Sequence, residues 1–420
     1  MMSFKVIDDE LIDFSKAAGG KKEEDQQPVV IVVVGAGGGG SNAVDAMIRC
    51  GIEGVRFLAV NTDVKVLVKS LAESKLQIGV NTTAGRGAGG MPDRGEKAAQ
   101  EDETKIKEAL KDADMVFVIA GMGGGTGTGS APVIARVAKS LGALTVGVVT
   151  KPFGFELNKR MKQAEEGIDK LRNEVDTLIV IPNEKLFNII DRKTPFKAAF
   201  AKADEVLYQG VKGISDIIVE TGYINIDFAD AEAVMRNQGD ALMTTGYGQG
   251  EDKVGEAVSS AMDNPLLEDT SIKGATQILV YVSGGEDFSL VEYDEVIKAI
   301  TKDIHPDANV IAGMYVDPDM EGKIRVTVIA TGFESAASRK VQTFPNADKG
   351  TSKPAEVITD EEYQTMRDRT KKQNDFLPHR NGYAEEDLDI PTLIRDRRFI
   401  SSAGGDASGR TGSFDKAGSS

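Results

Sequence analysis

The 420-residue sequence contains no tryptophan, one cysteine and two histidines, and each scarcity excludes a class of protein. A single cysteine, Cys50, cannot form an intrachain disulfide, which fits a reducing cytosol. His305 and His379 lie far apart in the sequence, so neither a histidine-based zinc site nor a catalytic triad is expected. No apolar run reaches the roughly 18 residues that a membrane-spanning helix requires.

Basic residues are outnumbered, with 50 Lys and Arg against 66 Asp and Glu and a net charge of −16. A protein this acidic is not expected to bind nucleic acid or an anionic membrane through its bulk surface. Local N–H groups can still hold a small anion. The first ten residues contain acids and no long apolar core, so they do not predict a signal peptide. We therefore expect a cytoplasmic protein.

Glycine, in contrast, is abundant and is concentrated in two runs that each follow an apolar segment. The first run fits the pattern G-x-G-x-x-G at Gly35, Gly37 and Gly40. The second run covers 121–129 and precedes a predicted helix. A strand, a glycine loop and a helix together present backbone N–H groups to an anion at a positive helix end. Two such loops on neighbouring strands can enclose one di- or triphosphate from both sides.

The residues alone leave other interpretations open. The first run, with Asp63 at the end of the second predicted strand, also fits a dinucleotide-binding oxidoreductase. Such an enzyme does not need the second glycine run, and no histidine is evident for proton transfer. Because no lysine follows either run in the Walker A position, a P-loop NTPase is excluded on pattern. Ordinary strand–helix turns would explain one or two glycines in each run, but not the composition of 121–129.

Short apolar strands alternate with helices, which predicts an α/β fold with a parallel, doubly wound sheet. Strands are expected at 29–34, 55–60, 115–120, 144–150 and 177–181, and helices at 42–50, 96–110, 132–141 and 160–173. One long helix is expected from Pro195 to Glu220. After it, a smaller α+β unit is expected, with helices at 231–237 and 253–262 and strands at 277–282, 308–316 and 324–331.

The motifs, the element pattern and the composition together lead us to expect the following division of the chain. The expected parts are a disordered N-terminal extension at 1–27, a nucleotide-binding domain at 28–205, a central helix region at 206–224, an α+β domain at 225–333, a disordered linker at 334–385, a peptide with apolar anchors at 386–400 and a flexible tail at 401–420.

The two glycine runs and three further segments closely resemble the FtsZ family, the bacterial tubulin homologues of cell division. The further segments are Asn61–Asp63, Thr150–Glu156 and Asn225–Asp230, and the run 121–129 is the most specific match. The resemblance extends over about 29–332 and resumes at 388–398. It implies a GTP-binding domain joined by a long central helix to a smaller α+β domain. It also implies a GTPase that forms head-to-tail protofilaments and the division ring of bacterial cytokinesis.

The resemblance implies which residues bind GTP or GDP. Phosphate contacts are implied for three loops, at Gly38, Gly39, Gly40, Ser41 and Asn42; at Gly121, Gly124, Gly125, Thr126, Gly127, Thr128 and Gly129; and at Gly87, Ala88 and Gly89, with Asp63 in the same set. Glu156 and Arg160 match contacts to ribose and phosphate, and Phe200 and Asp204 match residues that stack on and hydrogen-bond guanine. A carboxylate suits guanine because it accepts from both N1–H and N2–H, whereas adenine presents an acceptor at N1.

Simpler interpretations of these side chains exist. Glu156 and Arg160 are four residues apart and could form only a surface ion pair worth about 0.3 kcal/mol. Phe200 could be an ordinary core aromatic. Met91 occupies a position where the family often has asparagine, so we expect backbone N–H groups of residues 87–89 to reach the γ-phosphate.

Asn225, Asp227 and Asp230 match the loop that, in the family, completes the active site of the next subunit in a filament. Two carboxylates and an amide can orient a water for attack on the γ-phosphate, with Mg²⁺ expected nearby. Asp227 could equally cap a helix that begins at Phe228, with Asp230 at its third position. A nucleotide-binding scaffold without hydrolysis is a further alternative, which the presence of all three residues disfavours.

The segment Leu388–Arg398 resembles the tail peptide by which the family docks onto membrane-tethering partners. Its apolar residues and Pro391 suit a short helix in a partner's groove. The resemblance therefore implies membrane-tethering and regulatory division proteins as partners, and a location at the mid-cell division site.

Overall fold

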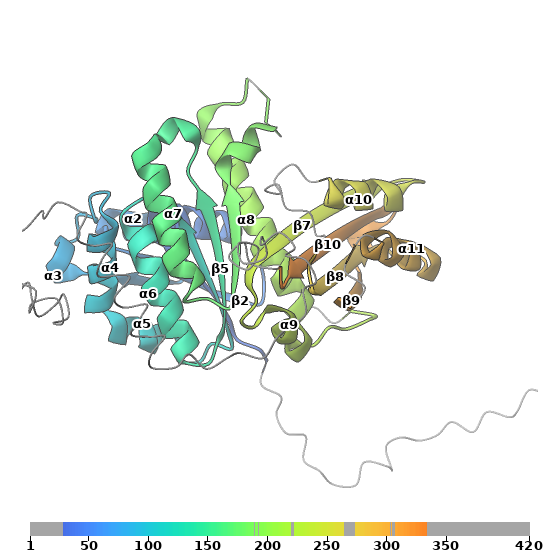
Figure 1. Cartoon of the computed structure of the whole chain (residues 1–420), viewed down its shortest axis with the longest axis horizontal. Coiled ribbons are helices and arrows are strands. Elements are labelled where there is room, and N and C mark those ends of the chain that lie inside the picture. The colour runs from blue at the N-terminus through green and yellow to red at the C-terminus, as the bar shows by residue number, and fades with distance from the viewer. Residues whose placement is uncertain are drawn as a thin grey trace, which may run out of the picture. The chain divides into compact units, whose positions relative to one another are not determined.

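The structure is a computed structural model that describes residues 28–333, except 189, 192, 220–221, 264–273, 303, 305 and 306. Within these residues, ten strands form one sheet in the order β3-β2-β1-β4-β5-β6-β7-β10-β8-β9 (Figure 1). The predictions for 1–27, 334–385, 386–400 and 401–420 lie outside the described residues, and so does the expected peptide Leu388–Arg398.

The first six strands are parallel, as the alternation of strands and helices predicted. They are β1 (Ile31–Ala36), β2 (Val55–Asn61), β3 (Ser74–Gln77), β4 (Met115–Gly121), β5 (Leu144–Lys151) and β6 (Thr177–Pro182). All residues of β1 are buried, and β4 and β5 are buried except at their last residues. Burial of this kind is typical of a parallel sheet that is covered on both faces.

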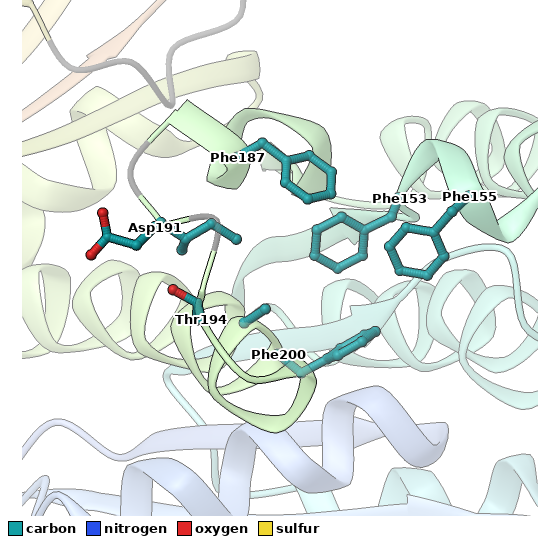
Figure 2. Close-up of a pocket in the computed structure, with 8 residues that line it drawn as sticks. Phe153, Phe155, Phe187, Asp191, Thr194 and Phe200 are labelled. Carbon is teal, nitrogen blue, oxygen red and sulfur yellow. The ribbon is translucent and has the colours of Figure 1, made fainter.

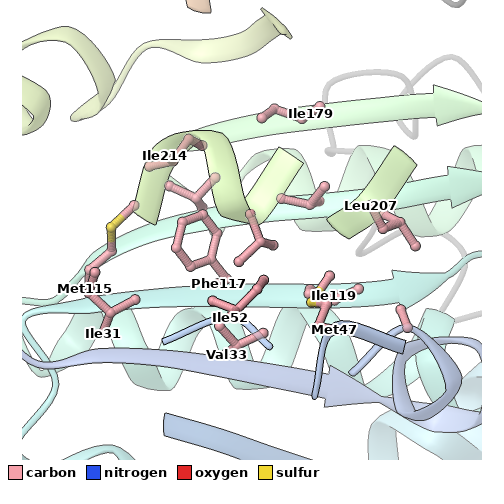
Figure 3. Packing of buried hydrophobic residues seen from close by; sticks show 14 of the residues in the cluster. Ile31, Val33, Met47, Ile52, Met115, Phe117, Ile119, Ile179, Leu207 and Ile214 are labelled. Carbon is pink, nitrogen blue, oxygen red and sulfur yellow. The ribbon is translucent and has the colours of Figure 1, made fainter. Parts of the chain in front are cut away.

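Helices cover both faces of this parallel part. They are α1 (Gly37–Arg49), α2 (Val64–Lys69), α3 (Val80–Thr83), α4 (Pro92–Glu101), α5 (Glu103–Leu110), α6 (Thr126–Ser140) and α7 (Asn158–Arg172). Phe117 and Ile119 of β4 share one core cluster with Met47 of α1 (Figure 3). On the other face, α4 to α7 cover a second cluster, which contains Val116 and Val118 of the same strand.

A long central helix, α8 (Phe196–Val219), follows β6 and a short 3₁₀ segment, Asn183–Asn188. At 1.5 Å per residue its 24 residues extend over about 36 Å. Leu207, Val211 and Ile214 recur at helical spacing and are buried in the cluster of Phe117 (Figure 3). The long helix predicted over 195–220 is therefore confirmed within one residue at each end.

A smaller α+β part follows α8. Its elements are α9 (Phe228–Met235), β7 (Gly239–Gln249), α10 (Lys253–Met262), β8 (Gln277–Gly284), α11 (Leu290–Thr301), β9 (Asn309–Val316) and β10 (Lys323–Thr331). β10 pairs antiparallel with β7 and β8, and β8 pairs in parallel with β9. β7 also pairs in parallel with the start of β6, which joins both parts into one sheet. The predicted fold class is confirmed.

Several element limits were predicted wrongly. α1 begins at Gly37 rather than at 42, and α6 begins at Thr126 rather than at 132. The single helix predicted over 96–110 is two helices that meet at Asp102, whose φ of −113° interrupts the first. β3, β7 and α11 were not predicted as elements.

Candidate functional site

The two glycine runs lie side by side at the carboxyl edge of the parallel sheet. β1 and β4 pair in register, with Ala36 opposite Ala120, so both runs begin at the same level. Each run continues directly into a helix, α1 or α6, whose N-terminus has no side-chain cap and no acidic residue in its first turn. The N-termini of α2, α9 and α11, in contrast, are capped by side chains. Uncapped N–H groups at two positive helix ends that lie side by side are suited to bind an anion.

Some glycines are required because the two runs touch each other. A Cβ on Gly37 would lie 2.6 Å from the backbone N of Gly127, and Gly37 has a φ of +72°. A Cβ on Gly39 would lie 3.1 Å from the Cα of Gly121. These contacts bring the two loops together, as a site that encloses one polyphosphate requires.

The remaining glycines of the runs divide into two groups. A Cβ on Gly40 would lie 2.3 Å from the carbonyl O of Ile119, and a Cβ on Gly129 would lie 2.1 Å from the carbonyl O of Pro92. At both positions only glycine allows the backbone segments to pack this closely. A Cβ on Gly38 or Gly124 would meet no atom within 4 Å. Gly38 and Gly124 therefore leave open space beside the two helix N-termini.

The hydroxyl side chains of the runs stabilise the loops. Ser41 donates to the Gly37 carbonyl at 2.7 Å, and Thr128 accepts from the Gly123 N–H at 2.8 Å. The Thr126 hydroxyl lies 2.6 Å from that of Thr62, which follows β2. Backbone N–H groups are thus the main donors that the two runs offer to an anion.

The expected phosphate-sensing loop lies against the second run. Ala88 is buried, and its Cβ would lie 2.9 Å from a Cβ on Gly125. The Gly87 N–H donates to the Thr62 carbonyl at 3.3 Å, so it is used within the loop. Among the described residues, Ala88 and Gly89 have no such backbone acceptor for their N–H groups. Met91 is 56% exposed and directly precedes α4.

A carboxylate holds the start of this loop. Glu101 accepts four hydrogen bonds, from the backbone N–H groups and the side chains of Asn81 and Thr82, at 2.7 to 3.0 Å. Hydrogen bonds, first that of the Thr82 side chain, keep the pKa of Glu101 below its usual range. Arg94 donates to the Thr82 carbonyl through two nitrogens. Two side chains of α4, Glu101 and Arg94, therefore hold the start of the loop that carries Ala88.

One candidate residue was not singled out from the sequence. Asn61, the last residue of β2, is 2% exposed, and its Nδ2 has no hydrogen-bond partner among the described residues. A buried donor without a partner costs free energy unless a ligand or water satisfies it. Asp63, which the sequence placed in the nucleotide set, caps α2 by accepting from the Lys65 N–H at 2.9 Å.

Glu156 and Arg160 form the ion pair that their spacing suggested, with 2.7 Å between Oε2 and Nη1. The backbone of Arg160 packs on the second glycine run, because a Cβ on Gly123 would lie 2.6 Å from the Arg160 carbonyl O. The pair is thus placed beside the predicted phosphate site.

Phe200, in the first turns of α8, belongs to a cluster of phenylalanines. Its ring meets the buried Phe153 edge to face, with centroids 5.2 Å apart, and Phe153 also contacts Phe155 and Phe187. All four rings line a pocket of about 690 Å³ (Figure 2). Phe200 is therefore both a packed aromatic and a pocket wall.

Asp204 lies one helical turn after Phe200 and is half-buried. Burial raises the pKa of Asp204 to about 6, and the charge of Arg49 on α1 opposes this shift. α1 packs on α8, and Arg49 is the last residue of α1, at the end of that helix away from the first glycine run. The structure thus places Glu156, Arg160 and Phe200 at the same edge of the sheet as the glycine runs, with Asp204 one turn further along α8.

The predicted catalytic loop lies elsewhere, at the opposite edge. The C-terminal end of α8 packs beside the start of β2, at the amino edge of the sheet. A Cβ on Gly54, the residue before β2, would lie 2.7 Å from the side chain of Val219. Thr177, the first residue of β6, donates to the carbonyl of Met235 at the end of α9. The distance from Phe200 to Val219 along α8 is about 28 Å. The loop therefore lies at the far end of α8 from Phe200, next to α9 (Figure 1).

Within this loop the predicted capping arrangement is confirmed. Asp227 caps α9 by accepting from the Asp230 N–H at 2.8 Å, and Asp230 accepts from the Asp227 N–H at 3.4 Å. Asn225 accepts from the Gly222 N–H at 2.6 Å. Ile224 pairs with Met314 of β9. The three polar side chains are thus well fixed in space.

Neither a metal centre nor a membrane span is found in the described part of the chain. No group of three or more His, Cys, Asp or Glu side chains is placed to hold a metal ion there. None of the helices described is both long and apolar enough to cross a bilayer.

Comparison with known proteins gives the family. Residues 30–191 match the GTPase domain of the Tubulin/FtsZ family, and residues 239–334 match the C-terminal domain of the FtsZ family. The M. jannaschii FtsZ, solved as an empty dimer, is 47% identical, with a TM-score of 0.69 over 73% of this chain and 89% of that chain. The chain belongs to the FtsZ family. It therefore carries a GTPase domain, and the oxidoreductase alternative is wrong.

More distant structures share the fold. CetZ1 from Haloferax volcanii, a GDP-bound monomer, is 20% identical with a TM-score of 0.64 over 74% of this chain and 97% of that chain. CetZ2 from the same organism, a GTPγS-bound protofilament, is 19% identical with a TM-score of 0.63 over 82% of this chain and all of that chain.

Proposed function

We propose that this FtsZ-family chain is a self-assembling GTPase in which the Asn225–Asp230 loop of one subunit acts on the GTP held by the next. The observation that carries the proposal is the position of this loop at the opposite edge of the sheet from the glycine runs. A loop that is fixed about 28 Å along α8 from the base site has no reach to its own nucleotide. A second copy, stacked head to tail, supplies it.

In this proposal the triphosphate lies between the N-termini of α1 and α6. Gly38 and Gly124 leave room for it, and the N–H groups of Ala88 and Gly89 receive the γ-phosphate. The Glu156–Arg160 pair contacts the ribose and phosphates. Phe200 stacks on guanine, and the ionised Asp204 accepts from N1–H and N2–H.

The chemistry is supplied by Asn225, Asp227 and Asp230. In-line attack needs a water held opposite the leaving oxygen, and two carboxylates with an amide are suited to orient it. The described residues form no metal centre of their own, so Mg²⁺ is proposed as an ion that the nucleotide phosphates and water would coordinate. No role of these residues depends on it.

Assembly and location complete the proposal. The solved M. jannaschii FtsZ is a dimer and the solved CetZ2 a protofilament, which supports head-to-tail assembly by likeness. A place at the mid-cell division site, with membrane-tethering partners bound through Leu388–Arg398, is proposed from the family resemblance.

The test is the GTPase rate per molecule against protein concentration, combined with sedimentation in GTP and in GDP. The proposal predicts a rate that rises with concentration and pelleting that requires GTP. Asp230→Ala should bind GTP with unchanged affinity and hydrolyse it at least about tenfold more slowly. A rate that is independent of concentration, without pelleting in GTP, would refute assembly-dependent hydrolysis.

A further inference from the structure

A buried ionic cluster lies at the amino-terminal edge of the parallel sheet, away from the nucleotide site. Its centre is Asp176, which directly precedes β6 and is 0% exposed. The Asp176 Oδ2 accepts from the Thr145 N–H at 2.9 Å, and Oδ1 lies 3.1 Å from Nζ of Lys139. The Asp176 carbonyl accepts from the N–H groups of Gln238 and Gly239, each at 2.9 Å. The cluster thus joins the start of β5 and β6 to the segment that follows α9.

Further contacts in this cluster hold the last turn of α9 and the residues just after it. Lys139, in the last turn of α6, also donates to the side chain of Asn237 at 3.0 Å and to the Val175 carbonyl at 3.3 Å. Thr177 donates to the Met235 carbonyl in the last turn of α9. Side chains from α6 and β6 therefore fix the C-terminal end of α9 to the GTPase domain.

Arg236, the residue that follows α9, also belongs to this cluster. Its Nη1 lies 3.9 Å from the Asp176 Oδ2, and its Nη2 donates to the Gly142 carbonyl at 3.2 Å. Arg236 and Lys139 are both part-exposed, so the charge of the buried carboxylate is balanced from the rim of the cluster. Such an arrangement fixes a geometry more than it stabilises the fold, since apolar residues often replace buried ion pairs without loss of stability.

The cluster matters because α9 is short. Its eight residues extend over about 12 Å, with Asp227 and Asp230 at the end opposite to the cluster. A tilt of about 5° at the held end would displace those carboxylates by about 1 Å, which is large enough to reduce a rate by about a hundredfold. The rest of the segment is held by the pairing of Ile224 with Met314, by the buried Ile226, and by the Thr331 hydroxyl, which donates to the Val234 carbonyl at 2.7 Å. The cluster adds the polar contacts at the C-terminal end of α9.

We propose that Lys139 and Asp176 are positioning residues for the catalytic loop: they hold the end of α9 and so fix where Asp227 and Asp230 meet the GTP of the next subunit. The inference rests on the proposed function, because it concerns the loop that acts on a neighbour. It predicts that a subunit with either residue replaced binds GTP normally, but that its catalytic loop acts poorly on the GTP of its neighbour.

The experiment is complementation between variants of the full chain. Lys139→Met removes the charge and keeps an apolar stem, so its own site should bind GTP normally while its loop is displaced. Gly38→Ala is designed to fill the phosphate space and to leave the loop intact. GTP hydrolysis is measured for each variant alone and for mixtures, at a GTP concentration that saturates Lys139→Met but not Gly38→Ala. Asp230→Ala replaces Lys139→Met in a parallel series.

The matched control is Lys170→Met. Lys170 of α7 forms a 2.8 Å ion pair with Glu96 of α4, so it is also a lysine paired with a carboxylate, but this pair does not involve α9. We expect the control to hydrolyse GTP at the wild-type rate. Lys139→Met alone should be at least about tenfold slower at unchanged GTP affinity, and added Gly38→Ala should restore most of the rate.

Each other outcome contradicts the inference. A wild-type rate for Lys139→Met would overturn it. A slow Lys139→Met that Gly38→Ala does not rescue, when Asp230→Ala is rescued, would place the defect in the nucleotide site of the variant itself. If neither variant is rescued, the proposed action on a neighbour fails as well. Thr177→Val, which removes only the donor to Met235, replaces Lys139→Met if circular dichroism shows that the latter is unfolded.

Discussion

Alanine in place of Gly38 should impair nucleotide binding without impairing folding. A Cβ at this position meets no atom within 4 Å, and Gly38 lies in the first turn of α1 without a positive φ. Replacing glycine by alanine at a compatible position stabilises a protein by about 0.4–1 kcal/mol, because the unfolded chain loses entropy. For a domain of this size the melting temperature should rise by about 1–4 °C.

The effect on binding has the opposite sign. The methyl group would occupy the space beside the N-terminus of α1, where the proposed phosphate accepts backbone hydrogen bonds. Loss of one hydrogen bond to a charged group costs about 1.5–3 kcal/mol. GTP affinity should therefore fall about 10- to 150-fold.

Gly40→Ala provides the contrast, measured by thermal melting and by equilibrium titration with a fluorescent GTP analogue. A Cβ there would lie 2.3 Å from the Ile119 carbonyl O, so this variant should lose roughly 1–3 kcal/mol of stability through overpacking. Wild-type GTP affinity in Gly38→Ala, or a stability loss like that of Gly40→Ala, would refute the assignment of the open space to phosphate.

Other predictions concern side chains around the same site and the catalytic loop. Because burial raises the pKa of Asp204 to about 6, GTP affinity should fall as the pH drops from 7 to 5, since the neutral carboxyl cannot accept from both guanine N–H groups. The raised pKa also affects folding: the stability that this group contributes is greatest at low pH and is lost as the pH rises through 6. Asp204→Asn should weaken GTP binding at pH 7 and remove its part of the pH dependence, as titrations of both proteins would detect. Asp227→Ala should lower stability by about 1 kcal/mol through loss of the α9 cap and should also slow hydrolysis, whereas Asp227→Asn should retain the cap and slow hydrolysis alone. Glu101→Gln should weaken binding of GTP more than that of GDP, and equal weakening of both would contradict a role of its loop at the γ-phosphate.

The sequence predicted the parallel part of the fold better than the limits of its helices. Uninterrupted apolar strands such as 115–120 predict a sheet covered on both faces, and the structure confirms it. Glycine has a low helix propensity, so the starts of α1 and α6 were expected in loops. In the structure Gly37–Gly40 already form the first turn of α1, because the contact with Gly127 and the packing on Ile119 hold them there.

β7 was missed for a related reason. Its sequence contains glycines at 246 and 248, which weaken strand propensity. They are needed because α10 packs directly on the strand, where a Cβ on Gly248 would lie 1.8 Å from the Lys253 carbonyl O. Only the tertiary contact explains this composition.

In the candidate site, too, features that are local in sequence were predicted, and contacts between distant segments were not. Spacing alone predicted the pair of Glu156 with Arg160 and the cap of Asp227 on α9, because both are local in sequence. The unpaired amide of Asn61 and the contacts of Asp176 depend on segments far apart in the sequence. The distance between the Asn225–Asp230 loop and the glycine runs also required the structure, because it depends on the direction of α8 relative to the sheet.

The central claim is that the Asn225–Asp230 loop acts on the nucleotide of a neighbouring subunit. The most direct test mixes Asp230→Ala, which keeps its nucleotide site, with Gly38→Ala, which keeps its loop. Each variant alone should hydrolyse GTP slowly, and the mixture should recover a large part of the wild-type rate because one variant supplies the loop and the other the GTP. A mixture no faster than the sum of its two components would contradict the account.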